Sequence, residues 1–72
     1  LMDHLVSTTD TVRLSFLLSL LRDAGIKAHV FDANISALEA GIGAFPRRIM
    51  VPTKWLLAAK TLLEDANEFY DD

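Results

Sequence analysis

The chain has 72 residues, no cysteine and a formal net charge of −3, and its 51% of hydrophobic residues exclude a wholly disordered chain. Its weak acidic balance argues against nucleic acid as a partner, because non-specific affinity for nucleic acid comes from a basic surface. No apolar run is long enough to span a membrane, and the run Phe16 to Leu18 is broken at once by Ser19. We therefore expect one cytoplasmic domain over residues 1–72, with a core of residues 4–66 and an acidic C-terminal tail of residues 67–72.

A strand and a helix are predicted in the first third of the chain. His4 to Thr8 is rich in apolar and β-branched residues, which is typical of a strand. Asp10 is a suitable N-cap for a helix over residues 11–24, in which leucines recur at i, i+3, i+4 and i+7. Gly25 follows as the expected C-terminal glycine.

Two more strands and a second helix are predicted after Gly25. Residues 26–32 and 47–52 both alternate between apolar and polar side chains, as strands with one buried face do. A helix is expected to begin with Thr53 as its N-cap and to leave Leu57 exposed. Its buried stripe is expected to consist of Trp55, Leu56, Ala59, Leu62, Leu63 and Ala66.

The order β-α-β-β-α predicts an α+β fold, a ferredoxin-like plait that lacks its fourth strand. The long connection 33–46 allows the third strand to insert between the first two, which gives the sheet order 1-3-2 with both helices on one face. The first strand is then left with an unpaired edge. Phe31 and Met50 lie on the uncovered sheet face, and Phe16 and Leu20 widen the apolar side of the first helix. Such surfaces invite another copy of the chain, so we expect a homo-oligomer, most simply a dimer, with these four residues at the interface.

The connection 33–46 is also where function is expected, because long connections in compact domains are often binding loops. Glycines bring backbone amides close to a ligand, and Arg47 and Arg48 add two cations beside them, which is a reasonable cradle for an anion or phosphate. The alternative is that the glycines only form turns and the arginines pair with Asp32 or Glu39. The residues expected to bind an effector or a partner are Asp32, Asn34, Gly41, Gly43, Phe45, Arg47 and Arg48.

No catalytic residue, metal site or cofactor is predicted. His4 and His29 are expected on the uncovered sheet face, but two histidines without a nearby carboxylate do not make a metal site. Asp32 ends a strand, where catalytic acids often lie, yet no second acid or base is placed to complete a pair. We therefore expect a protein that is not an enzyme.

Three stretches of the sequence, DTVRLSFL (10–17), LRDAGI (21–26) and GIGAFPRRIMV (41–51), are similar to a known family. It is the small bacterial family catalogued as "putative prokaryotic signal transducing protein", whose function is not established, and the resemblance extends over residues 4–66. It implies a fold like that of the trimeric GlnB-type nitrogen-regulatory proteins, which contact their targets through a flexible loop between strands. The chain is shorter than those regulators and carries no recognisable nucleotide-binding residues.

Three functions remain open at this point. The favoured one is a regulatory module whose loop 33–46, with Arg47 and Arg48, binds a protein partner or a small anionic effector. The second is a structural or oligomerisation domain in which the loop is passive. The third is a small enzyme that acts on a phosphorylated metabolite at Asp32 and the two arginines.

Overall fold

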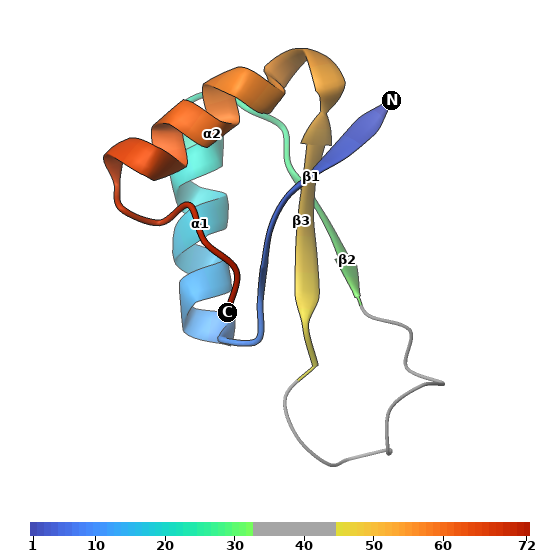
Figure 1. Cartoon of the computed structure of the whole chain (residues 1–72), viewed down its shortest axis with the longest axis vertical. Helices are drawn as coiled ribbons and strands as arrows, with labels where there is room; N and C mark the ends of the chain where they lie inside the picture. Colours follow the sequence, from blue (N-terminus) through green and yellow to red (C-terminus); the bar gives the residue numbers. More distant parts are fainter. Residues whose placement is uncertain (33–44) are drawn as a thin grey trace.

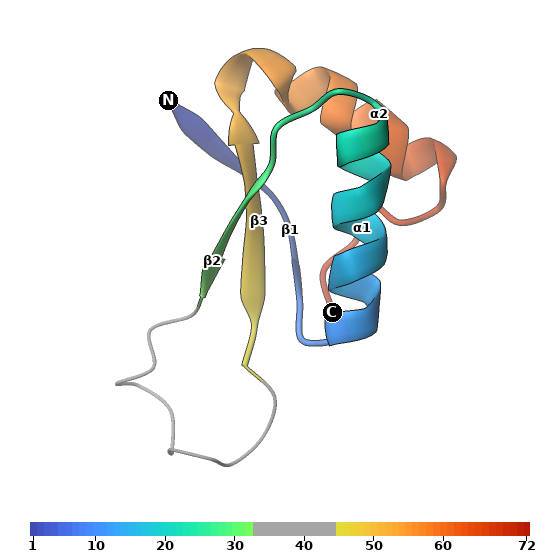
Figure 2. The ribbon, with the colours of Figure 1, turned by 180° about the vertical axis from the view of Figure 1, so that it is seen from behind.

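A three-stranded sheet with two helices on one of its faces makes up the computed structural model, which describes residues 1–32 and 45–72 (Figures 1 and 2). The elements in chain order are β1 (Met2–Thr8), α1 (Thr11–Asp23), β2 (His29–Asp32), β3 (Arg47–Pro52), the 3-10 turn η2 (Thr53–Trp55) and α2 (Leu56–Asp65). The strand β3 lies between β1 and β2 and is antiparallel to both. The predicted β-α-β-β-α fold with sheet order 1-3-2 is therefore confirmed. Neither described helix is long and apolar enough to cross a membrane.

Both ends of α1 follow the signals in the sequence. The Asp10 carboxylate accepts hydrogen bonds from the backbone N–H groups of Val12 (2.9 Å) and Arg13 (3.2 Å), so Asp10 is the N-cap. At the other end Gly25 has a positive φ of 77°, and the N–H groups of Gly25 and Ile26 bond back to carbonyls of the last turn. This left-handed ending satisfies carbonyls that the helix leaves without partners.

The end of α2 has the same geometry, but an asparagine takes the place of the glycine. Asn67 has a φ of 57°, its N–H bonds to the Glu64 carbonyl (3.0 Å), and the Glu68 N–H bonds to the Leu63 carbonyl (2.8 Å). The turn sends the last residues back between α2 and β1, toward the first turn of α1 (Figure 1).

The core lies between the helices and the inner face of the sheet. A β-bulge in β1, between His4 and Val6, allows the consecutive residues Leu5 and Val6 both to be buried. The buried core residues are Leu5, Val6, Leu14, Leu17, Leu21, Ile26, Ile49, Val51, Ala59 and Leu63. The apolar spacing of the first helix and the alternation of the third strand therefore identified much of the core.

Two strands differ from their predicted limits. The strand β1 begins at Met2 instead of His4, because Met2 pairs with Pro52. The strand β2 begins only at His29, whereas the alternation predicted a start at Ile26. Ile26 is nevertheless buried, since it packs against the core directly after the end of α1.

The prediction for the second helix is wrong at two places, namely its first turn and Ala66, the last residue of the predicted buried stripe. Thr53 opens the 3-10 turn η2 and does not cap the α-helix, which begins at Leu56. Because a 3-10 turn advances about 120° per residue, Trp55 falls off the buried stripe and is 41% exposed. Ala66 lies just past the end of α2 and is exposed as well.

Candidate functional site

The end of the sheet where β2 stops and β3 begins brings Asp32 and Arg47 together. The two residues are paired across the strands, and the Arg47 Nε lies 3.5 Å from Asp32 Oδ1. The side chains of Arg47 and Asp32 are 42% and 60% exposed, so this ion pair adds at most about 1 kcal/mol to stability. The pairing of an arginine with Asp32, one of the alternatives from the sequence, is thus observed for Arg47.

Arg48 lies on the other face of β3, because successive side chains of a strand point in opposite directions. Its cross-strand neighbours are Phe31 on β2 and Ser7 on β1. The Arg48 guanidinium carbon is 5.9 Å from the centre of the Phe31 ring, within the range of a cation–π contact. None of the ion pairs between described residues involves Arg48. Consequently the two arginines do not face one ligand from the same side of the sheet.

Arg48 belongs to the sheet face that no helix covers (Figure 2), which we call the open face. His4 and His29 are both paired with Met50, so strand β3 separates them by roughly 9–10 Å of backbone. Within residues 1–32 and 45–72, no group of three or more His, Cys, Asp and Glu residues is placed to hold a metal ion. The open face carries His4, Ser7, His29, Phe31, Arg48 and Met50, with Met2 and Pro52 at its far end, and none of these residues has a carboxylate.

The remaining predicted site residues are divided between described and undescribed parts of the chain. Phe45 is half-buried just before β3. Asn34, Gly41 and Gly43 lie outside the described residues. The contribution of these four residues to binding therefore stays a prediction.

The four residues predicted for an oligomer interface form two separate surfaces. Phe16 is 47% exposed and Leu20 is half-buried, and both belong to α1. Phe31 is 43% exposed and Met50 half-buried, and both belong to the open face. Because α1 covers the opposite face of the sheet, one contact with another copy would not bury both pairs (Figure 1).

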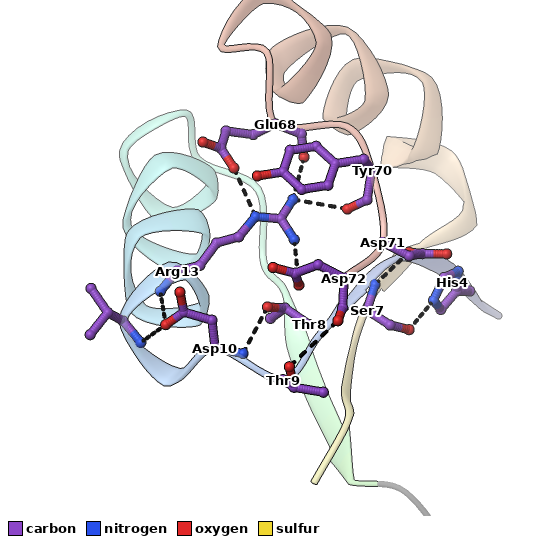
Figure 3. A network of polar contacts seen from close by, with 11 residues as sticks. His4, Ser7, Thr8, Thr9, Asp10, Arg13, Glu68, Tyr70, Asp71 and Asp72 are labelled. Carbon is purple, nitrogen blue, oxygen red and sulfur yellow. Dashed lines mark hydrogen bonds and ion pairs between the residues drawn. The ribbon is translucent and has the colours of Figure 1, made fainter. Parts of the chain in front are cut away.

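Arg13 forms a second cluster of polar contacts, which was not among the predicted sites (Figure 3). This residue lies in the first turn of α1 and is only 8% exposed. Its Nε donates to Glu68 Oε1 (2.8 Å), its Nη1 to Asp72 Oδ1 (3.0 Å), and its Nη2 to the carbonyls of Glu68 (2.7 Å) and Tyr70 (2.9 Å). The guanidinium also stacks on the Tyr70 ring, 3.9 Å from its centre.

Two opposing effects act on the pKa of Arg13. Burial alone would lower it, but the hydrogen bond to Glu68 and the electrostatic interactions with Tyr70 and Asp72 outweigh burial and raise the pKa. Arg13 is therefore a permanently charged group enclosed by the residues that compensate its charge.

The residues that hold Arg13 also occupy the edge of β1. We call residues 68–72 the strap. The Ser7 N–H donates to Asp71 Oδ1 (2.7 Å), and the Ser7 carbonyl accepts the Asp72 N–H (3.0 Å). The Thr9 hydroxyl adds a longer bond to the Asp72 carbonyl (3.4 Å). The edge of β1, predicted to be unpaired, is thus covered at Ser7, on the side where the fourth strand of a plait would lie.

The sequence did contain a signal for this cluster. Arg13, Leu17 and Leu21 follow one another at intervals of four residues, so they lie on one side of α1. A cation on the buried side of a helix needs an acidic partner, and the acids crowded in residues 68–72 are the available set.

The strap is expected to release from the domain in acid. The pKa of Asp72 is below its ordinary value of 3.8, mainly because of a hydrogen bond from the Thr8 hydroxyl and then because of the Arg13 charge. A carboxyl with a lowered folded-state pKa stabilises the docked state above its ordinary pKa, and this contribution is lost as the pH falls through the folded pKa. We expect the Ser7 and Asp72 amide signals in NMR to be unchanged from pH 7 to about 5 and to move toward undocked positions below about 4. In Asp72→Asn this change of the amide signals with pH should be smaller than in wild type. A change of equal size would mean that protonation of Asp72 does not release the strap.

A comparison with protein families is decisive for the classification of the chain. The family described as "Putative prokaryotic signal transducing protein" matches residues 2–67. The chain belongs to this family. The match runs from the start of β1 to Asn67, the residue that turns the chain after α2, and the strap follows it. No curated protein gives a significant match to the sequence.

Proposed function

We propose that this member of the signal-transducing family is an interaction module that binds an acidic segment of a partner protein on its open face, with Arg48 as the anchor. One observation carries the proposal. Arg48 stands beside an exposed aromatic ring, the strand residues of its sheet face carry no carboxylate, and no described acid forms an ion pair with it.

The chemistry of the open face fits a protein partner. A guanidinium binds a carboxylate through two parallel hydrogen bonds, and its contact with Phe31 holds it in place before binding. Met50, at the centre of the face, is an adaptable apolar residue suited to a partner's side chain. Apolar groups with a polar rim on an uncovered face are typical of interaction surfaces.

The loop residues predicted from the sequence are proposed to belong to the same site. The segment 33–44 leaves β2 after Asp32 and returns to β3 through Phe45, so it is attached at the end of the sheet where Arg48 lies. The ion pair between Asp32 and Arg47 bridges the two strands at this point. A role in binding is favoured over catalysis because the carboxylate of Asp32 faces a cation instead of a second acid or base.

Reversing the charge of Arg48 is expected to abolish partner binding. Wild-type protein, Arg48→Glu and Arg22→Glu would be immobilised and exposed to an extract of the native cell, and retained proteins quantified by mass spectrometry. Arg22 is the matched control, since its side chain is 78% exposed on α1 and its replacement changes the net charge equally. Proteins retained by wild type and Arg22→Glu should fall at least about tenfold on Arg48→Glu, the factor that about 1.4 kcal/mol of binding energy produces. Equal retention on all three would refute the proposed anchor.

Two further measurements separate the alternatives. Titration of the labelled protein with ATP and with inorganic phosphate, followed by amide NMR, would show shifts at Phe31 and Arg48 if the ligand were a small anionic effector. Sedimentation equilibrium of Phe31→Lys and wild type would show a loss of self-association if a second copy occupied the open face.

A further inference from the structure

We propose that the strap is an internal occupant of a peptide-binding site anchored by Arg13, and that an acidic, extended segment of a partner protein displaces it. This inference does not rest on the open face. Its anchor is Arg13 and not Arg48, and from β1 it uses the main-chain groups of Ser7 that point away from β3 (Figure 3).

The contacts of the strap define what the site recognises. Arg13 binds two main-chain carbonyls and two carboxylates, and Ser7 offers one N–H and one carbonyl at the edge of β1. Main-chain contacts to a strand edge do not depend on the sequence of the bound segment, as in other cases where a peptide is added to a sheet. The carboxylates supply the selectivity. In the strap they belong to Glu68, Asp71 and Asp72. We therefore expect the partner's segment to carry one acidic residue followed by two more at the third and fourth positions after it.

The strap is held in a way that permits exchange. Its two aromatic side chains remain substantially exposed, Phe69 at 39% and Tyr70 at 49%. Its contacts with Ser7, Thr9 and Arg13 are hydrogen bonds, ion pairs and one stacked ring, and no strap residue belongs to the buried core. Release therefore removes no side chain from the buried core, and the freed carboxylates regain water.

Arg13 makes the site selective for an acidic occupant. The residue is 8% exposed, and a buried charge without a partner is strongly unfavourable. A neutral segment that covered Arg13 would bury its charge without a counter-charge, whereas an acidic segment supplies the carboxylates that the strap supplies now. The strap competes from within the same chain at an effective concentration on the order of millimolar, so weakening it should make the site available to an added peptide.

The test uses the labelled protein of residues 1–72 and a synthetic peptide with the sequence of residues 66–72, Ala-Asn-Glu-Phe-Tyr-Asp-Asp. The double variant Glu68→Gln with Asp72→Asn weakens the strap by removing two carboxylates that contact Arg13. The double variant Glu64→Gln with Asp65→Asn removes the same charge from exposed positions of α2. Binding is followed through the Ser7 amide and the Arg13 Nε–H signals.

We expect the peptide to bind the strap-weakened variant at least about tenfold more tightly than wild type or the α2 control variant. A peptide with Gln and Asn in place of its three acids should not bind. The inference is overturned if the neutral peptide binds equally well, if all three proteins bind the acidic peptide alike, or if the strap-weakened variant keeps native core signals but binds no peptide. Displacement of the strap by inorganic phosphate at the same concentration would also overturn it, because the site would then be a simple anion site. If the double variant does not fold, Glu68→Gln alone should bind the acidic peptide about threefold more tightly than wild type. An unchanged affinity for the peptide would count against the inference.

Discussion

Replacing Leu17 by alanine is expected to lower the free energy of unfolding by about 3 kcal/mol. Leu17 is 0% exposed and lies at the centre of the cluster between α1 and the sheet. The substitution removes its transfer free energy and leaves a cavity that rigid neighbours cannot fill. For 72 residues the total stability is on the order of 4–11 kcal/mol, so a large part of it would be lost. Thermal unfolding followed by circular dichroism should show a melting temperature lower by about 12 °C or more.

Leu57→Ala is the matched control for this prediction. Leu57 is also a helical leucine, but it is 78% exposed on α2. Its replacement should change the free energy of unfolding by no more than about 0.5 kcal/mol. Similar losses for both leucines would mean that the core does not lie where α1 meets the sheet.

The fold was predictable because its determinants are local and periodic. The leucine spacing of residues 11–24 and the capping residue Asp10 define a helix without reference to the rest of the chain. The alternation around Ile49 and Val51 likewise identifies a strand with one buried face. The long connection between the second and third strands then made the sheet order 1-3-2 the natural topology.

Errors arose where the local period changes without a clear signal in the sequence. Trp55 occupies a helical stripe position only if the α-helix starts at Thr53, and the 3-10 turn η2 moves it toward solvent. The alternation predicted for residues 47–52 already puts Arg47 and Arg48 on opposite faces of the strand, and the structure has one beside Asp32 and the other beside Phe31. Adjacent cations in the sequence are therefore not one cationic site when they belong to a strand.

The strap was not predicted because its determinants are far apart in the sequence. Arg13 and the residues that bind it are separated by 55 to 59 positions, and no short-range pattern links them. A tail with several acids normally predicts a solvated end. Here the turn at Asn67 aims that tail at the one buried arginine of α1.

Replacing Arg13 by methionine is expected to release the strap and to lower the free energy of unfolding by about 2 kcal/mol. Breaking a buried ion pair costs about 3–5 kcal/mol when the remaining charge stays buried. The loss is smaller here because the side chains of Glu68 and Asp72 are 23% and 36% exposed and can turn into water. Arg13→Lys keeps the charge but cannot reproduce the four hydrogen bonds of the guanidinium, so it should fall between wild type and Arg13→Met.

Amide hydrogen exchange distinguishes release of the strap from a general loss of stability. In Arg13→Met the Ser7 and Asp72 amides should lose nearly all protection, because their hydrogen bonds join the strap to β1. The Ile49 amide in the central strand should lose only as much protection from exchange as the lower free energy of global unfolding accounts for. Arg22→Met, at an exposed position of the same helix, should leave both groups of amides unchanged. If Ser7 and Asp72 stayed protected in Arg13→Met, the strap would be held by its contacts with β1 alone, and Arg13 would not be the anchor of a peptide-binding site.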